Sequence, residues 1–455
     1  MGNFYLSSKV VANGDFRMNN DTALKLFNSF TFKKCSLVVN SGAKCTFLVG
    51  NVELPRLDSE YEYALTVNEN GIGIVGKDYG CLMRGFFAML MKIEREYGKS
   101  DLFIRECNEV SKYKLQNRMI HICVFPESSL IQLKRLVRLI GALQYTHIVV
   151  EFWGTLKLDT LPQLSWENAF SKDEIGELLK EIKDLGLKAI PMFNSLGHAS
   201  LSRSMSGKHT VLDNDSSLYY LFTPDGWAWD LENEQVWALL KKIRLELYEL
   251  FDDCEYFHLG FDESHIHSTN SYLSSRLPYY LSRLTNEVAS EGKHPMVWMD
   301  MLLPPCAFKD MKIQPHSKKS DTECREIIKM LAPSTVLIDW EYDVCVPPIS
   351  SLIYFKDIGY DIMGAPWLDP ENGYAHIDTV VSNNLFGVMQ TTWHTLSENM
   401  DKLLHFAKYF GASLPYWENE CPSQATTATL LRCVTFEKLD YLSTGWIGKQ
   451  IKTDC

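Results

Sequence analysis

From about residue 114 to residue 393, short strand-like runs alternate with longer polar and helical stretches. The runs are rich in β-branched and aromatic residues, as expected for strands that are covered on both faces of a parallel sheet. The eight predicted strands are residues 118–124, 146–152, 187–193, 256–261, 295–300, 334–340, 360–365 and 386–393. Eight strands with helices between them are the elements of a (β/α)8 TIM barrel. The sequence therefore predicts an α/β fold of this type, with long loops.

Two of the connections between predicted strands carry clear helical patterns, at residues 171–185 and 233–251. Ser171, with Glu174 three residues later, forms a capping box, which marks the first turn of a helix. A doubly wound open sheet is the alternative fold for alternating strands and helices. Its glycine-rich phosphate-binding turn is missing after residues 118–124, so the barrel is the preferred prediction.

The first part of the chain has a different pattern, and 455 residues exceed the size of one ordinary domain. Short β-like runs occupy residues 35–39, 46–49, 63–67 and 72–75, and the turn-forming residues 68–71 predict a hairpin. A helical pattern follows from Tyr79 to about Glu96. We predict a small α+β domain over residues 1–112, without a catalytic motif, and the barrel over residues 113–455.

Charge and cysteine content argue against several classes of protein. The net charge is −12 and no basic block is present, so nucleic acid is not an expected partner. No apolar run reaches the roughly 18 residues of a membrane-spanning helix, so no membrane association is expected. The 12 cysteines include no C-x-x-C pair, which favours reduced thiols over a zinc ribbon or disulfide scaffold. The first residues lack the pattern of a secretory signal, so we expect a cytoplasmic protein.

Two adjacent carboxylates, Asp262 and Glu263, end the fourth predicted strand. Neighbouring residues of a strand point to opposite faces, so both side chains share one surface only if the chain turns there. In a TIM barrel the C-terminal ends of the strands form the catalytic face. The alternative interpretation is that Asp262 caps the next helix and Glu263 lies in its first turn.

The ends of the other predicted strands are also polar and aromatic. They contribute Glu151 after strand two, His198 after strand three, Trp298 in strand five, Trp340 in strand six, Trp367 and Asp369 after strand seven, and Trp393 in strand eight. Carboxylates perform acid–base work on glycosidic bonds, and indole rings stack on the apolar faces of sugars. This combination at one barrel mouth predicts a carbohydrate site.

On these residues the chain resembles the family 20 glycoside hydrolases, the β-N-acetylhexosaminidases. Residues 258–263 read His-Leu-Gly-Phe-Asp-Glu and are similar to the family's motif after strand four, and Gly197-His198-Ala199 is similar to its motif after strand three. The resemblance covers most of the chain and implies a barrel preceded by a small α+β domain. It further implies exo-acting hydrolysis of terminal N-acetylhexosamine residues of a glycan or glycoconjugate, without a cofactor or metal.

The resemblance also implies the roles of individual residues in a substrate-assisted reaction with retention. Glu263 would protonate the leaving oxygen while the acetamido oxygen of the substrate attacks the anomeric carbon. Asp262 would orient the acetamido N–H, and His198 would tune Glu263. Arg118 would hold ring hydroxyls, and Glu151 would pair with His198. The remaining substrate-binding residues implied by the resemblance are Trp298, Trp340, Trp367, Asp369 and Trp393.

Some positions depart from the family pattern. Phe261 stands beside the acid pair where the family has a small residue. Trp367 replaces the tyrosine that holds the acetamido carbonyl, so Tyr342 or Tyr374 is expected to supply that hydroxyl. Thr395 replaces a carboxylate that grips the far hydroxyls. The choice between GlcNAc and GalNAc, the linkage and the oligomeric state stay open.

Two other functions remain as alternatives. A metal-dependent barrel hydrolase is suggested by the histidines near the acid pair, among them His265 and His267, because a His-x-His pair binds zinc in some proteins. A non-catalytic sugar-binding barrel is suggested by Phe261 and Thr395, although the intact acid pair argues against it.

Overall fold

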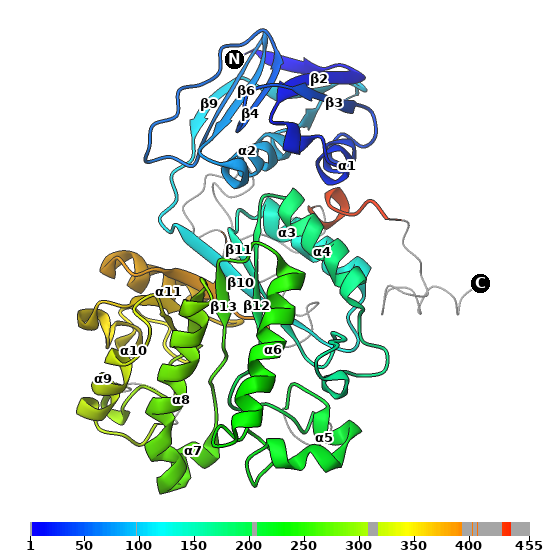
Figure 1. The fold of residues 1–455 in the computed structure, drawn as a ribbon. Coiled ribbons are helices and arrows are strands. Elements are labelled where there is room, and N and C mark those ends of the chain that lie inside the picture. The colour runs from blue at the N-terminus through cyan, green and yellow to red at the C-terminus, as the bar shows by residue number, and fades with distance from the viewer. Residues whose placement is uncertain are drawn as a thin grey trace, which may run out of the picture.

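The computed structural model describes residues 2–96, 98–202, 207–307, 317–393 and 430–437, together with Leu403 and Ala407. Thr395 and the C-terminal part of the predicted barrel domain lie outside these residues. Within them the chain forms an N-terminal sheet domain and a closed barrel, which lie one above the other in Figure 1. No helix among the described residues is long and apolar enough to cross a membrane.

The N-terminal domain contains a six-stranded sheet and a smaller three-stranded one. The larger sheet has the order β3 (Ser36–Ser41), β2 (Lys9–Gly14), β4 (Thr46–Gly50), β6 (Gly71–Gly76), β5 (Tyr63–Asn68) and β9 (Cys107–Val110), and the smaller one β1 (Asn3–Leu6), β8 (Leu102–Arg105) and β7 (Glu94–Arg95). The predicted hairpin at residues 68–71 is confirmed, because β5 and β6 pair antiparallel across it. Helices α1 (Asp21–Phe30) and α2 (Tyr79–Met91) lie between the larger sheet and the barrel (Figure 1).

Eight parallel strands close into a barrel, which confirms the predicted fold. They are β10 (Asn117–Val124), β11 (His147–Phe152), β12 (Lys188–Met192), β13 (Tyr256–His258), β14 (His294–Trp298), β15 (Val336–Asp339), β16 (Asp361–Gly364) and β17 (Gly387–Gln390). Strand β17 pairs with β10, and this pairing removes both sheet edges. The observed strands are mostly shorter than the predicted runs, whose last residues form the loops of the barrel mouth.

Helices connect the barrel strands and cover the outside of the barrel. The connections contain α3 (Leu130–Ala142), α4 (Lys172–Asp184), α5 (Val211–Asn214), α6 (Glu234–Phe251), α7 (His265–Thr269), α8 (Ser271–Ser290), α9 (Asp321–Lys329), α10 (Ser350–Ile353) and α11 (Pro370–Asn383). Ser171 and Glu174 form the predicted capping box at the start of α4. The loops with α5 and α7 lie at the end of the barrel away from the N-terminal domain (Figure 1).

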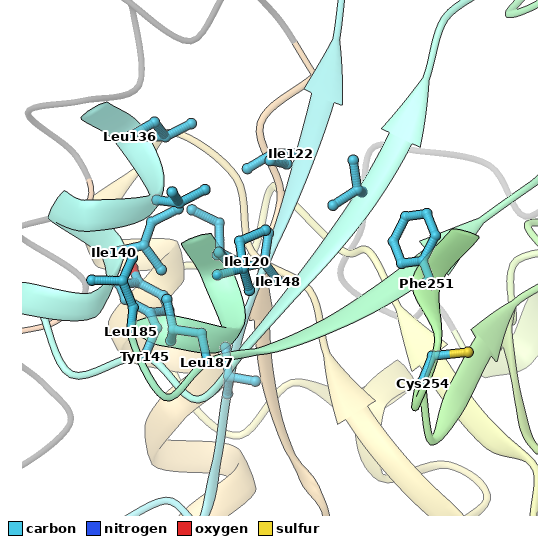
Figure 2. Packing of buried hydrophobic residues seen from close by; sticks show 14 of the residues in the cluster. Ile120, Ile122, Leu136, Ile140, Tyr145, Ile148, Leu185, Leu187, Phe251 and Cys254 are labelled. Atoms are coloured by element: carbon cyan, nitrogen blue, oxygen red, sulfur yellow. The ribbon is translucent and has the colours of Figure 1, made fainter. Parts of the chain in front are cut away.

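Side chains alternate between the two sides of each barrel strand and form two separate cores. Ile120 and Ile148 point outward and pack with Leu136 and Ile140 of α3 in the core between barrel and helices (Figure 2). Their neighbours point inward, where methionines and branched residues fill the barrel: Met119, Val149, Ile190, Met192, Met296, Val336, Ile338, Met363 and Met389. This alternation decides which polar side chains near the strand ends enter the barrel mouth.

Candidate active site at the C-terminal ends of the barrel strands

The acid pair lies on a tight turn that follows β13. Three of its four residues have a positive φ: Gly260 at 68°, Phe261 at 83° and Glu263 at 48°. Side chains other than glycine rarely adopt this region, so the surrounding structure must hold Phe261 and Glu263 there. Helix α7 begins only at His265, with Ser264 before it, so Asp262 does not cap it. The turn brings both carboxylates to the same histidine, and the capping alternative is wrong.

Several contacts fix the backbone of this turn. The Glu263 N–H donates to Asp300 Oδ2 over 3.1 Å, and the Trp227 indole N–H donates to the Glu263 carbonyl oxygen over 2.8 Å. A Cβ atom on Gly260 would lie only 2.4 Å from the side-chain amide of Asn194, so the turn accepts no larger residue there. Groups from the loops that follow β12 and β14 thus hold Glu263 in its strained conformation.

His198 lies between the two carboxyl groups, as predicted from the motif after strand three. Its Nε2 atom is 3.4 Å from Asp262 Oδ2 and 3.2 Å from Glu263 Oε2. The ring packs on Trp227, with 4.5 Å between ring centres. Burial lowers the pKa of His198, but the negative charge of Asp262 and the hydrogen bonds to Asp262 and Glu263 together outweigh burial and raise the pKa to about 9. The imidazole therefore carries a proton at neutral pH and acts as a cation beside the acid pair.

The two carboxyl groups have different surroundings. The Asp262 side chain is 8% exposed and that of Glu263 is 36% exposed. Burial raises the pKa of Asp262, but the positive charges of Lys208 and His198 outweigh it and hold the pKa below its usual value. Asp262 is therefore ionised, and its Oδ1 atom is buried without a hydrogen-bond partner among the described residues.

A buried lysine, Lys208, joins the ends of three strands. Its Nζ atom lies 2.8 Å from Glu151 Oε1 and 3.7 Å from Asp262 Oδ2. With the Asn194 amide oriented to satisfy both of its ends, its oxygen accepts from Lys208 over 2.7 Å and its nitrogen donates to Glu151 over 3.1 Å. Lys208 was not among the predicted site residues, because one lysine in a long loop carries no motif.

Glu151 enters the barrel mouth because it lies two residues after the inward-facing Val149 on β11, so both side chains point to the same side of the strand. It does not pair with His198, which corrects the role expected for it. Its carboxylate contacts Lys208, accepts from the Trp153 indole over 2.8 Å, and lies 3.3 Å from His121 Nε2. Glu151 therefore reaches Asp262 of the acid pair through Lys208.

Aromatic residues from three strand ends surround Tyr342, which follows β15. The rings of Trp340 and Trp367 lie 5.4 and 5.5 Å from the Tyr342 ring, and the Trp393 indole donates to its hydroxyl oxygen over 2.6 Å. Burial raises the pKa of Tyr342, and the charges of Asp262 and Glu263 also act on it, so its phenol stays protonated. Three of the predicted tryptophans thus meet around a tyrosine that lies close to the acid pair.

The other predicted residues of this wall have different positions. Trp298 is completely buried and packs under Trp393, with 5.7 Å between ring centres, so it supports the wall from inside the barrel and offers no face to a ligand. Asp369 caps α11 by accepting from the Glu371 N–H over 2.8 Å. Tyr374 lies on α11 with 44% of its surface exposed, which leaves Tyr342 as the tyrosine inside the site.

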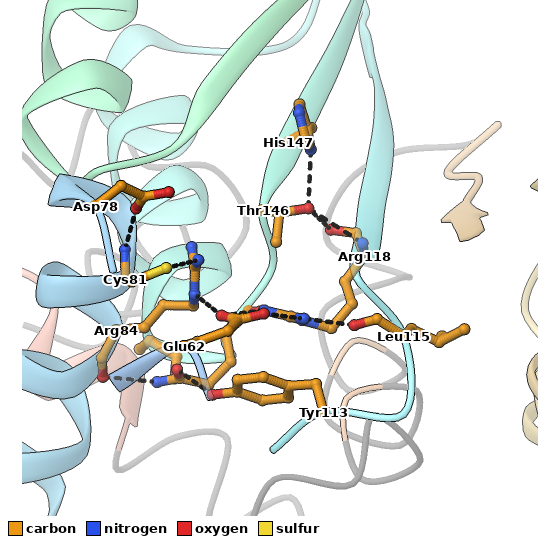
Figure 3. Close-up of polar contacts among 11 residues, drawn as sticks. Glu62, Asp78, Cys81, Arg84, Tyr113, Leu115, Arg118, Thr146 and His147 are labelled. Atoms are coloured by element: carbon orange, nitrogen blue, oxygen red, sulfur yellow. Dashed lines mark hydrogen bonds and ion pairs between the residues drawn. The ribbon is translucent and has the colours of Figure 1, made fainter. Parts of the chain in front are cut away.

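Arg118 does not lie at the barrel mouth, and the prediction that it binds sugar hydroxyls is wrong. It follows Asn117 at the start of β10 and alternates with the inward-facing Met119, so its side chain points out of the barrel at the opposite end. Its guanidinium bonds to both carboxylate oxygens of Glu62 over 2.8 and 3.0 Å (Figure 3). Arg118 therefore joins the barrel to the N-terminal domain.

A groove of about 1000 Å³ lies near this contact, between the N-terminal domain and the N-terminal ends of the strands. Its lining includes Glu62, Arg84 and His147 but neither residue of the acid pair. Arg84 Nε donates to Glu62 over 2.6 Å and thus adds a second cation to the Arg118–Glu62 pair (Figure 3). The groove is a feature of the domain contact and is remote from the candidate chemistry.

The histidines that suggested a metal site do not come together. His265 is exposed, and the His267 Nδ1 atom lies 2.7 Å from the Ser264 hydroxyl. The group of potential ligands that the described residues do bring together is His121, Cys123 and Glu151. A cation there would meet the Lys208 ammonium, which already binds Glu151, so the metallohydrolase alternative finds no support in this geometry.

Comparison with known proteins identifies the fold. Protein-family models match no part of the chain, and curated proteins give no match either. Solved structures do match, among them the family 20 exo-β-N-acetylglucosaminidase of Vibrio harveyi, with a TM-score of 0.66, 14% identity, and coverage of 96% of this chain and 76% of that one. The β-N-acetylhexosaminidase of Bacteroides fragilis matches with a TM-score of 0.61 and 14% identity over 99% of this chain and 92% of that one. The Streptomyces plicatus enzyme matches with a TM-score of 0.64 and 12% identity over 95% and 91%. The chain thus has the fold of the family 20 β-N-acetylhexosaminidases.

Proposed function

We propose that the protein is an exo-acting β-N-acetylhexosaminidase, a glycoside hydrolase that removes terminal N-acetylhexosamine residues from a glycan or glycoconjugate. The fold supports this reaction class, and so does the combination of an acid pair, a cationic histidine and an aromatic wall at the barrel mouth.

One observation carries the proposal. Asp262 is ionised, and its buried Oδ1 atom has no hydrogen-bond donor among the described residues. A buried carboxylate oxygen without a donor is costly, so a ligand that offers an N–H group gains a strong charge-assisted bond there. The 2-acetamido group of an N-acetylhexosamine carries such an N–H next to the anomeric carbon.

The proposed reaction assigns different tasks to the two carboxyl groups. Glu263, the more exposed of the pair, protonates the glycosidic oxygen while the acetamido oxygen attacks the anomeric carbon. This attack forms a cyclic oxazolinium ion, and Asp262 stabilises the positive charge that develops on its nitrogen. Glu263 then removes a proton from water, which opens the ring with net retention. Substrate-assisted glycosidases are exceptions to the usual two-carboxylate scheme, and in them no covalent bond forms between the sugar and an enzyme carboxylate.

In this proposal Tyr342 binds the acetamido carbonyl, which is the role of the family tyrosine that Trp367 replaces. Its neutral phenol accepts from Trp393 and keeps its own O–H as a donor for the acetamido carbonyl. Holding that carbonyl oxygen near the anomeric carbon is a positioning task, and good alignment of reacting atoms lowers barriers by several kcal/mol, roughly 7–11 in well-oriented cases.

A panel of 4-nitrophenyl glycosides with and without the 2-acetamido group tests the activity. We expect turnover of the N-acetyl-β-hexosaminides and almost none of the plain β-glucoside. Glu263→Gln should lower kcat on an unactivated disaccharide by about 10²–10⁴-fold, because it removes the general acid. Glu177→Gln, which changes an exposed glutamate on α4, is the matched control.

The same panel separates the alternatives. If Glu263→Gln hydrolyses the disaccharide at the wild-type rate, Glu263 is not the general acid. Binding of N-acetylhexosamines without any turnover would show that the protein is a non-catalytic sugar-binding barrel. A thiazoline mimic of the oxazolinium should bind far more tightly than the product sugar. A covalent adduct trapped on Asp262 or Glu263 with a 2-fluoro sugar would exclude the substrate-assisted reaction.

A further inference from the structure

A single ammonium group lies buried between two carboxylates at the centre of the barrel mouth. The side chain of Lys208 is 2% exposed, as is that of Glu151, and the Asp262 side chain is 8% exposed. The bond to Glu151 is short at 2.8 Å, whereas Asp262 is 3.7 Å away. Lys208 is therefore anchored by Glu151 and faces Asp262 at a distance that leaves the aspartate free to bind something else.

Aromatic rings shape this position as well. The Lys208 ammonium lies 4.9 Å from the ring centre of Trp393 and 5.5 Å from that of Trp153. Both contacts are cation–π interactions, which are stronger when desolvated. The ammonium thus has partners on several sides, and its position is defined by side chains from different strand ends.

We infer that Lys208 is a positioning residue which, anchored by Glu151, keeps Asp262 ionised and aimed at the acetamido N–H of the substrate. This inference rests on the proposed function for the identity of the ligand, but the effect of Lys208 on Asp262 is a property of the protein alone. Neither the acid-pair motif nor the fold assigns this lysine a role.

The reason is electrostatic. A buried carboxyl group without a nearby cation takes up a proton, because burial disfavours its charged form. Two cations oppose this at Asp262, and of the two the Coulomb attraction of Lys208 lowers the pKa of Asp262 more than that of His198 does. Burial lowers the pKa of Lys208, but the negative charges of Asp262 and Glu151, together with the hydrogen bond to Glu151, keep it raised.

The charges around Asp262 balance in this arrangement. Lys208 and His198 are cations, and Glu151 and Asp262 are anions, so the set is neutral when Glu263 carries its proton. Among the described residues, the other titratable groups that face the set include His121 and Cys123 on β10, His209 next to Lys208, His258 on β13 and Tyr342 after β15. Burial lowers the pKa of His258 to about 3 and raises that of Cys123, so both are neutral at the pH of the experiment.

The kinetic experiment compares the pH dependence of kcat/KM in the wild type and four variants. In Lys208→Met the acid limb should move to higher pH by about one unit or more, which lowers kcat/KM on that limb about tenfold per unit. Lys208→Arg keeps the charge and should return the limb toward its wild-type position. The double variant Lys208→Met with Glu151→Gln removes both buried charges, and it guards against misfolding caused by an unpaired Glu151. Lys183→Met removes an exposed lysine of α4 and should not change the profile.

A second measurement needs no turnover. In protein labelled with ¹³C at the aspartate carboxyl groups, the resonance that Asp262→Asn removes reports the ionisation of Asp262. It should titrate below the ordinary value of about 3.9 in the wild type and above it in Lys208→Met and in the double variant. Equal titration in all of these proteins would overturn the inference about Lys208. Failure of the wild type to cleave any N-acetylhexosaminide would overturn the proposed function instead, and the NMR result would still decide the role of Lys208.

Discussion

The carbonyl oxygen of Asp262 lies 2.4 Å from the position that a Cβ atom on Gly197 would occupy. The chain segments that follow β12 and β13 therefore touch, and only a residue without a side chain fits at position 197. This close approach places His198, which follows Gly197, beside both carboxyl groups. The acid pair and its histidine come from two different loops, and one glycine lets these loops meet.

Gly197→Ala should consequently damage the site more than the fold. The added methyl group must push the backbone of residues 197 and 262 apart, which weakens the contacts of His198 with Asp262 and Glu263. We expect a loss of about 10²-fold or more in kcat/KM, as follows from misplacing catalytic groups by about 1 Å. Gly176→Ala on α4 is the control, because its new methyl group meets nothing within 4 Å and alanine favours a helix. Equal activity of both variants would refute the tight contact.

Arg118 should matter for stability and not for sugar binding. Arg118→Met leaves the partly buried Glu62 with Arg84 alone, and breaking a buried ion pair costs about 3–5 kcal/mol of unfolding free energy. Chemical denaturation measures this loss, while KM for an N-acetylhexosaminide should stay at the wild-type value. Lys112→Met breaks an exposed pair and should change the stability little. A large rise in KM for Arg118→Met would instead place this arginine in the sugar site.

The pKa of His198 predicts a pH dependence of stability. The pKa is raised in the folded state to about 9 from its ordinary value of 6.5, so folding favours the protonated ring. The resulting stabilisation is fully present below about pH 6.5 and is lost as the pH rises through about 9. The difference in unfolding free energy between wild type and His198→Gln should therefore be constant at low pH and shrink between these values, by on the order of 3 kcal/mol. A difference that does not change over this range would contradict the ion pairing of His198.

Tyr342→Phe tests the expected replacement for the missing tyrosine. The variant keeps the ring between Trp340 and Trp367 but loses the hydroxyl that binds the Trp393 indole. If this hydroxyl also holds the acetamido carbonyl, kcat for N-acetylhexosaminides should fall by about 10-fold or more, since the acetamido group becomes charged in the reaction and a hydrogen bond to a charged group is worth roughly 1.5–3 kcal/mol. Tyr374→Phe changes an exposed tyrosine and serves as the control. A similarly small effect in both variants would show that a group other than the Tyr342 hydroxyl binds the acetamido carbonyl.

Metal removal should leave the activity intact. His121, Cys123 and Glu151 are close enough to bind a cation together, but Lys208 already neutralises the carboxylate. We expect full turnover after prolonged treatment with a strong chelator, measured beside an untreated sample. Loss of turnover that added zinc restores would favour the metal-dependent hydrolase.

Local patterns in the sequence were sufficient to predict the elements of the fold. Runs of β-branched and other apolar residues around Ile120 and Ile148 identified barrel strands, and Ser171 with Glu174 identified the start of α4. Strand ends were extended too far in the prediction, because the residues that line the mouth continue the apolar and aromatic pattern beyond the last paired residue. The acid pair and His198 were predicted from motifs, because each motif lies within a few consecutive residues.

The sequence by itself thus determined the barrel, the acid pair and the histidine beside it, since hydrophobic periodicity and short motifs are local properties of the chain. Only the tertiary structure decided where isolated charged side chains find their partners. It placed Arg118 at the domain contact, because strand alternation turns it outward at the N-terminal end of β10. It placed Lys208 between Glu151 and Asp262, because buried charges must be paired and both of these carboxylates follow or lie on strands that are distant from the lysine in the sequence. Such pairing depends on how the loops at the barrel mouth pack against one another, and no local pattern encodes it.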